Sequence, residues 1–185
     1  MIITPTAIKD VLVLEPKVFG DHRGYFMETW RRSELENLGV KEEFVQDNQS
    51  MSLQKTLRGL HYQLGHPQGK LVRVVSGEIF DVAVDLRKSS DSFGQWIGHT
   101  LSAENHKQLW VPPGFAHGFY VTSESAEIVY KCTEYYYPED DHSLFWNDPD
   151  LAIGWPLLDG QPLLSDKDSA ATPFNDAPVY ESAFN

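Results

Sequence analysis

The sequence predicts a mainly β protein, a sandwich or closed barrel with a few short helices. Three observations carry this prediction: apolar and polar residues alternate in many short segments, turn-forming residues separate those segments, and helical periodicity is rare. The 185 residues fit one domain. We expect that domain to span residues 1–185, with a barrel core at about 40–138 and a C-terminal segment packed over it.

The clearest strand signal lies at Glu78–Arg87. Phe80, Val82, Val84 and Leu86 fall on one face of an extended chain and more polar residues fall on the other, the pattern of a half-buried strand. Similar runs predict further strands at Val11–Leu14, Tyr25–Trp30, Leu57–Gln63, Leu71–Val75, Gln95–Leu101, Gln108–Val111, Phe119–Val121 and Glu127–Tyr137.

Helix signals are confined to two places. Ser33 can cap a short apolar stripe that ends at Gly39, and Ser165–Asp168 can open a second short helix. From Ala170 onward, a stretch containing Pro and Asp predicts a tail laid over the surface.

Composition excludes several classes of function. A net charge of −12 argues against a nucleic-acid surface, because phosphate binding needs a basic one. A pocket can still gather a few Arg and Lys side chains around a small anion. No apolar run is long enough to span a membrane, and the single Cys132 allows no internal disulfide. We therefore expect a cytoplasmic protein with no membrane or nucleic-acid partner.

The usual cofactor and metal motifs are absent from the sequence. Neither G-x-x-x-x-G-K-[ST] nor G-x-G-x-x-G after a strand occurs. The closest histidine pairs are His61/His66 and His99/His106, and neither spacing puts two imidazoles side by side on one strand face. We expect no metal site and no cofactor.

Some predicted strands are polar where a plain strand would be apolar. Gln46 and Asn48 share one face, and Tyr130 and Tyr136 share another. Arg58 and His61 have opposite parity, so both can enter one pocket only if the strand is irregular. The glycine between them, at position 59, is the natural place for a bulge.

A series of motifs in fixed order carries a resemblance to a known family. They are Phe19–Gly24 with Glu28, Gln46–Asn48, Leu57–His61, Gln68–Arg73, Gly77–Asp85, Phe93–Trp96, Pro113–Phe119, Tyr130–Lys131, Trp146–Pro149 and Leu164–Asp168. Over nearly its whole length the chain resembles the dTDP-4-dehydrorhamnose 3,5-epimerases of rhamnose biosynthesis. The resemblance implies a jelly-roll, cupin-like barrel that forms a homodimer and acts on a dTDP-linked 4-keto-6-deoxyhexose without metal or cofactor.

The resemblance also implies residue roles. His61 matches the base that removes protons beside the C4 ketone, Asp168 its carboxylate partner, Tyr130 the acid on the opposite face, and Lys70 the cation at the enolate oxygen. The positions that match substrate contacts are Arg23, Phe26, Glu28, Gln46, Asn48, Arg58, His117, Tyr136, Asp141 and Lys167. Among these, His117 is expected near Lys70, and Phe26 and Tyr136 are candidates for stacking on thymine. The family's dimer can place some contacts across the subunit boundary.

Three other interpretations stay open at the level of sequence. The chain could invert only C3 or only C5 of a related sugar. It could bind a sugar nucleotide without catalysis, although binding alone needs no combination of base, carboxylate and acid. A metal-dependent barrel enzyme is the third, and the histidine spacing disfavours it.

Overall fold

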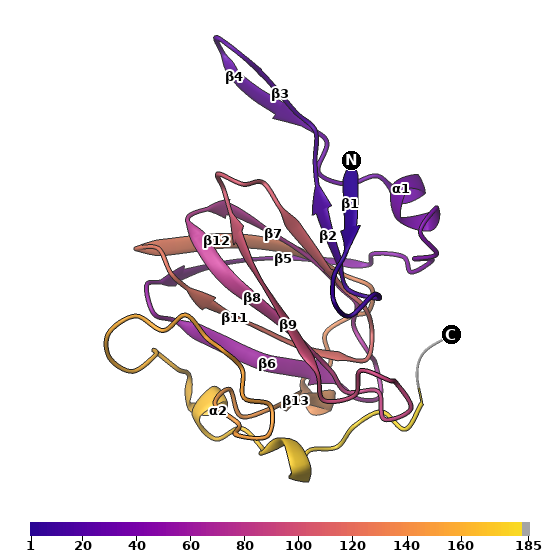
Figure 1. Ribbon diagram of the computed structural model, residues 1–185, viewed down its shortest axis with the longest axis vertical. Helices are drawn as coiled ribbons and strands as arrows, with labels where there is room; N and C mark the ends of the chain where they lie inside the picture. The colour runs from indigo at the N-terminus through magenta and orange to yellow at the C-terminus, as the bar shows by residue number, and fades with distance from the viewer. Residues whose placement is uncertain (183–185) are drawn as a thin grey trace.

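The computed structural model describes residues 1–182 and shows two antiparallel sheets that face each other (Figure 1). The six-stranded sheet has the order β1-β2-β10-β7-β12-β5, and the five-stranded sheet has the order β13-β6-β11-β8-β9. The strands of the first sheet are β1 (Ile2–Pro5), β2 (Leu12–Glu15), β10 (Gln108–Val111), β7 (Lys70–Ser76), β12 (Ser125–Cys132) and β5 (Gln46–Leu53). Those of the second are β13 (Asp141–Ser143), β6 (Leu57–Gln63), β11 (Phe115–Val121), β8 (Glu78–Asp85) and β9 (Trp96–Ser102).

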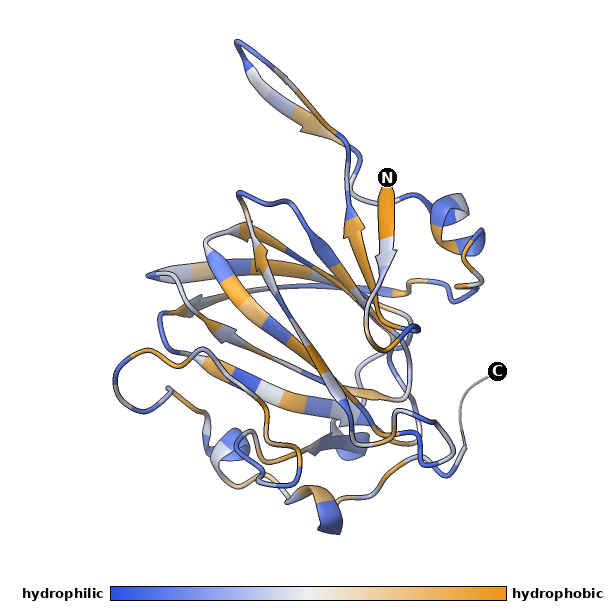
Figure 2. Cartoon of the chain, in the orientation of Figure 1, coloured by the Kyte–Doolittle hydropathy of each residue, from blue (hydrophilic) through white to orange (hydrophobic). Residues whose placement is uncertain are grey.

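Apolar side chains form three layers around these sheets. One buried cluster lies between the sheets and joins residues such as Val72 and Ile128 with Ala83 and Phe119. A second cluster covers the outer face of the five-stranded sheet, and a third lies under the helix α1 (Arg32–Glu36), where Leu35 is buried. Figure 2 shows how hydrophobic and hydrophilic residues mix along the strands. The mainly β prediction is confirmed.

Several predictions about strands were wrong. The strand expected at Tyr25–Trp30 ends at Met27. The strand expected to run to Tyr137 ends at Cys132, because the chain leaves β12 there for the loop before the short helix η1 (Pro138–Asp140). The polar face of β8 is not exposed: Asp81 and Asp85 are both 0% exposed, because that face points between the two sheets. Each of these buried carboxylates therefore needs a partner inside the protein.

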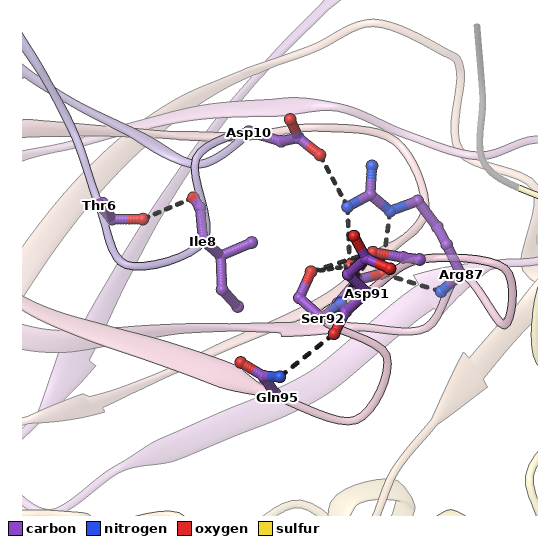
Figure 3. Close-up of polar contacts among 9 residues, drawn as sticks. Thr6, Ile8, Asp10, Arg87, Asp91, Ser92 and Gln95 are labelled. Atoms are coloured by element: carbon purple, nitrogen blue, oxygen red, sulfur yellow. Dashed lines mark hydrogen bonds and ion pairs between the residues drawn. The ribbon is translucent and has the colours of Figure 1, made fainter.

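Asp85 meets this need in a hydrogen-bond network with Arg87 and two serines, and Figure 3 shows Arg87, Ser92 and Asp10 at this place. The guanidinium of Arg87 donates to Asp85 at 2.9 and 2.7 Å and also reaches Asp10 at 2.9 Å, while Ser90 and Ser92 donate to Oδ2 of Asp85 at 2.7 and 2.6 Å. Burial works to raise the pKa of Asp85, but the bonds from Arg87 and the serines outweigh it and hold that pKa low. The network joins the N-terminal loop to the β8–β9 connection.

A two-stranded hairpin projects from the body of the protein. It consists of β3 (Val18–Asp21) and β4 (Gly24–Met27), which pair only with each other (Figure 1). Phe19, Tyr25 and Phe26 on this hairpin are 54%, 62% and 70% exposed. Tyr25 contacts the ring of His106 at 5.0 Å between centroids, and the aromatic surface of the hairpin is otherwise largely open to solvent.

The segment after β13 packs over the outer face of the five-stranded sheet. Trp146, Trp155 and Tyr180 belong to the buried cluster there. The segment contains the short helices α2 (Asp166–Ser169) and η2 (Phe174–Asp176). The predicted surface tail after Ala170 is thus partly built into the fold, since Tyr180 is 6% exposed. Within residues 1–182, no helix is long and apolar enough to cross a membrane.

Candidate active site

A cavity opens between the two sheets at the end where β6, β7 and β12 come together. Its volume is about 270 Å³, and an adjoining cavity of about 150 Å³ shares His61, Lys70 and Tyr130 with it. The larger cavity is lined by Gln46, Asn48, Gln63, Gln68, Tyr136 and Asp141, and the smaller one by Arg58 and His117 among others. Most of the residues expected to bind substrate therefore surround one space.

His61 and Asp168 form a close pair at the wall of this space. Nε2 of His61 lies 2.6 Å from Oδ1 of Asp168, which also accepts from the Gly59 N–H at 3.3 Å. Asp168 is 2% exposed. Burial works to raise the pKa of Asp168, but hydrogen bonds from His61 and Ser165 outweigh it, so the pKa is lowered. An ionised Asp168 fixes the Nε2–H tautomer of His61 and leaves Nδ1 as the basic nitrogen.

The N-cap of α2 explains how the carboxylate of Asp168 is oriented. Ser165 is the N-cap of α2 and accepts from the Asp168 N–H at 3.1 Å, while its hydroxyl donates to Oδ2 of Asp168 at 2.7 Å. This reciprocal cap holds one carboxylate oxygen and leaves the other for His61.

The predicted irregularity at Gly59 is present. Pairing of β6 with β11 runs His117 to His61 and Phe119 to Arg58, so the register shifts by one residue between them. Gly59 has φ +112°, and a Cβ there would lie 2.6 Å from the carbonyl oxygen of His117. Only glycine fits this position. The shift brings Arg58 and His61 to the same side of the strand, and both line the smaller cavity.

Tyr130 lines the same two cavities as His61 and comes from the other sheet. Burial raises the pKa of its hydroxyl, so Tyr130 keeps its proton and can act as an acid. The neighbouring strand supplies Lys70, which is 8% exposed, and burial lowers the pKa of its ammonium group. Among residues 1–182, no carboxylate lies within ion-pairing distance of Lys70 or Arg58. These cations can therefore accept an anionic ligand or developing negative charge.

The whole chain matches one family of known proteins. The family model for dTDP-4-dehydrorhamnose 3,5-epimerase matches residues 5–176. The dTDP-4-dehydrorhamnose 3,5-epimerase of Salmonella typhimurium is 55% identical over 183 residues, which is 98% of this chain and 100% of the relative. That of Pseudomonas aeruginosa is 54% identical over 178 residues, which is 96% of this chain and 98% of the relative. The chain belongs to the dTDP-4-dehydrorhamnose 3,5-epimerase family.

Solved structures agree with this membership. The dTDP-6-deoxy-D-glucose-3,5-epimerase of Legionella pneumophila, in complex with dTDP-4-keto-L-rhamnose, is 49% identical, covers 98% of both chains and has a TM-score of 0.95. A 3′-monoepimerase from Streptomyces bikiniensis, in complex with dTDP-quinovose, is 34% identical with a TM-score of 0.84 and covers 91% of this chain and 86% of its own. The cupin-like jelly-roll prediction is confirmed, and this member of the epimerase family is an isomerase.

The cavity of this epimerase-family chain has a polar rim. Nε2 of Gln46 donates to Oδ1 of Asn48 at 3.1 Å. The side-chain oxygen Oε1 of Gln46 accepts from the backbone N–H of Tyr136 at 3.0 Å. The hydroxyl of Tyr136 donates to Asp141 at 2.9 Å, and Lys167 pairs with the same carboxylate. Asp141 thus holds an aromatic ring and a cation together at the cavity mouth, although Tyr136 lies beyond the end of β12.

Three residues expected to contact substrate lie away from the cavity of their own chain. Arg23 and Phe26 are on the projecting hairpin, and Glu28 follows it. Arg23 pairs with Asp21 at 2.6 Å, and Glu28 pairs with Arg31 at 2.8 Å, all at exposed positions. One chain by itself does not bring these residues to the site.

Two residues beside the site, Asp81 and Ser143, were not predicted from the sequence. Asp81 is 0% exposed and accepts from Nε2 of His117 at 2.9 Å, so it orients that ring in the cavity wall. The sequence did contain a signal for Asp81, because it is a carboxylate in the middle of an otherwise apolar strand. A charge buried there requires a partner inside the protein. Ser143, on β13 opposite His61, had no signal in the sequence beyond its position in a short strand.

Proposed function

We propose that the protein converts dTDP-4-dehydro-6-deoxy-D-glucose to dTDP-4-dehydro-L-rhamnose by inverting C3 and C5. The observation that carries this proposal is the placement of His61 and Tyr130 on opposing sheets, where both line one cavity together with Lys70 from β7, the neighbour of β12. Inversion at a carbon requires a base on one face and an acid on the other. This arrangement supplies both.

The chemistry is a proton exchange through an enolate. His61 takes the proton from the carbon next to the C4 ketone, and the electron pair of that C–H bond moves toward the ketone oxygen. The Lys70 ammonium stabilises the negative oxygen. Tyr130 then donates its hydroxyl proton to the opposite face of the same carbon, and the ketone re-forms. His61 then loses its proton to solvent and Tyr130 regains one, and the same steps are repeated at the second carbon.

Binding of the nucleotide follows from the charges around the cavity. Arg58 donates through Nε to Ser52 at 2.9 Å, which leaves the end of its guanidinium available for a phosphate. Lys167 is the second cation suited to the diphosphate. Gln46 and Asn48 offer amide groups to the sugar, and the exposed ring of Tyr136 is placed to stack on thymine.

A homodimer completes the site in this proposal. The hairpin β3–β4 extends away from its own chain, so a second copy can receive Arg23, Phe26 and Glu28 at its cavity (Figure 1). In a two-fold dimer the exchange is reciprocal, and each site then contains residues from both chains. Phe26 would add an aromatic surface to the thymine side of the pocket.

The proposal needs neither a metal ion nor an organic cofactor. Abstraction of a proton beside a ketone needs a base, an acid and a positive group at the oxygen, and His61, Tyr130 and Lys70 supply these. We expect full activity in the presence of EDTA. A loss of activity on chelation that Zn²⁺ or Mg²⁺ restores would contradict this part of the proposal.

The test is to incubate the protein with dTDP-4-dehydro-6-deoxy-D-glucose in D₂O with EDTA and follow C3 and C5 by NMR. We expect deuterium at both C3 and C5 and formation of the L-configured product. No exchange with retained binding would identify a non-catalytic binding protein.

A single-centre epimerase is the second candidate, because one similar structure is a 3′-monoepimerase. Exchange confined to C3 would establish that alternative and leave the roles of His61 and Tyr130 intact. The same NMR experiment separates the two reactions, since each carbon is followed independently.

A further inference from the structure

Ser143 has a buried hydroxyl oxygen that makes no hydrogen bond within residues 1–182. In the part of the chain that the structure describes, its Oγ is the one buried side-chain oxygen or nitrogen without a hydrogen-bond partner. Ser143 is 9% exposed. A buried hydroxyl without a partner destabilises a fold, and alanine would remove the penalty without adding volume. The position therefore calls for an explanation other than packing.

The strand pairing places Ser143 directly beside His61. In the β13–β6 ladder, Ser143 is the Cα partner of His61. The next pair, Leu144 and Leu60, exchanges both backbone hydrogen bonds, at 2.9 and 3.4 Å. Ser143 and His61 therefore form the closely spaced type of antiparallel pair, in which the two Cβ atoms lie about 4.5–5.5 Å apart.

The two side chains also point to the same face. His142 and Tyr62, the preceding pair in the ladder, stack their rings at 5.4 Å. Because side chains alternate along a strand, Ser143 and His61 lie on the other face, together with Gln63 and Asp141. The last two line the larger cavity, and so does His61. Ser143 itself is not one of the residues that line the two cavities, so its free hydroxyl is buried beside His61 on the cavity side of the ladder.

We propose that Ser143 is a positioning residue for His61 in the epimerisation. Its hydroxyl rotates so that the oxygen faces the imidazolium formed when His61 takes the substrate proton. Asp168 stabilises that cation only through Nε2. The inference rests on the proposed function, because it assigns Ser143 a role only in the step where His61 becomes charged.

Other groups near His61 are charged or titratable, and Ser143 is not. They are Asp168 from α2, His117 from β11, Lys70 from β7, Tyr130 from β12, Asp141 from β13 and Arg58 from β6 itself. Removing Ser143 leaves all of them in place. A change in the pH dependence of the reaction on removal of this hydroxyl would therefore report its effect on His61.

The experiment compares Ser143→Ala, Ser143→Thr and Ser102→Ala with the unaltered protein. Ser102 is a matched control, because it is 7% exposed, lies on β9 of the same sheet, and its hydroxyl accepts from the Asn105 N–H in the adjoining turn at 2.9 Å. Thermal unfolding, kcat and the pH profile of kcat/KM are measured for each, with isotope exchange in D₂O as the assay.

Ser143→Ala is expected to keep or raise Tm while kcat falls about 3- to 30-fold with KM little changed. The acid side of the kcat/KM profile moves to lower pH, because the charged form of His61 loses a favourable neighbour. Ser143→Thr keeps the hydroxyl and recovers most of the lost rate. Ser102→Ala lowers Tm without moving the profile.

Three results would overturn the proposal. Unchanged kinetics in Ser143→Ala would make the hydroxyl a packing defect. Equal losses in the Ala and Thr variants would show that shape matters and the hydroxyl does not. A fall in Tm that parallels the fall in rate would indicate a structural role. If the unaltered protein itself exchanges no deuterium, the proposed function fails first, and that failure is distinct from these three.

Discussion

Nε2 of His61 lies 2.6 Å from Oδ1 of Asp168, although 107 positions separate the two residues in the chain. One side chain comes from a strand of the five-stranded sheet and the other from the capped helix α2 of the segment that covers it. In the proposed reaction this pair supplies the base, and several measurable consequences follow from its surroundings.

Asp168→Asn should slow the reaction more than it disturbs the fold. Without the carboxylate, the tautomer of His61 is no longer fixed and the imidazolium loses its counter-charge. We expect kcat to fall about 100-fold or more, measured as isotope exchange in D₂O. Asp166→Asn, at an exposed position of the same helix, is the control and should retain normal activity. Similar activity in both variants would remove Asp168 from the mechanism.

Tyr130→Phe should separate proton removal from inversion. His61 can still take a proton and return it, or a deuteron, to the same face. We expect deuterium to enter with configuration retained, while inverted product forms about 100-fold more slowly. Tyr135→Phe, whose ring is 55% exposed outside the cavity, serves as the control. Normal inversion by Tyr130→Phe would mean that another group supplies the proton.

Lys70→Met should stabilise the protein and abolish its activity. The buried ammonium has a lowered pKa, so between that value and the unfolded pKa the unfolded chain holds more protons. The destabilisation by this group is therefore full below the folded-state pKa, and the stability of the protein rises as pH increases from that value toward the unfolded pKa. Methionine should raise Tm by about 2–4 °C for each kcal/mol regained.

Comparison with Lys41→Met, at an exposed lysine, checks that the gain depends on burial. The difference in Tm between Lys70→Met and the unaltered protein should narrow as pH rises toward about 10, where the unfolded lysine also loses its proton. A lower Tm for Lys70→Met at neutral pH would contradict the prediction.

Asp85→Asn should weaken the fold in a pH-dependent way. The folded-state pKa of Asp85 is low, so its contribution is present above the unfolded pKa of about 3.9 and disappears as pH falls through the folded value. We expect a loss of about 3 kcal/mol at pH 7, because Arg87 keeps a buried charge without this partner. The difference in the free energy of unfolding between Asp85→Asn and the unaltered protein, measured by urea unfolding, should become smaller at acidic pH. Asp91→Asn, on the exposed surface of the same loop, should show neither effect.

Mixing two inactive variants should restore activity if the hairpin completes a neighbouring site. One variant carries Arg23→Ala with Phe26→Ala, and the other carries His61→Ala. Mixed dimers then contain one intact site, so random re-pairing should recover about a quarter of normal activity. The opposite result is a mixture that forms dimers and still shows only the summed activities of the two separate variants. That result would mean that each site is made from one chain alone.

Much of the fold was predictable because its strands follow simple alternation. Strands β6 and β10 begin and end where the pattern placed them, and Gly59 was identified as the irregular position because Arg58 and His61 differ in parity and both were expected in one pocket. Strand β5 was seen only as a polar segment, because Gln46 and Asn48 carry polar groups on its inward face where a core strand would be apolar.

The remaining errors have a common physical origin. Alternation reports that two faces differ, and it does not say that the polar face meets water. On β8 that face points inward, and the partners of Asp81 and Asp85 come from residues far along the chain or across a turn. The projection of the hairpin, which carries Arg23 and Phe26, likewise depends on packing beyond local sequence.

The position of Asp168 near the end of the chain has a consequence for how the enzyme is made. During translation both large sheets, except β13, are complete by residue 132, so the ribosome releases most of the barrel before the base has its carboxylate. Chains truncated before α2 would lack both that carboxylate and the covering of the outer sheet. A chain that stops before α2 would hold His61 without the carboxylate of Asp168, and we expect such a chain to be inactive.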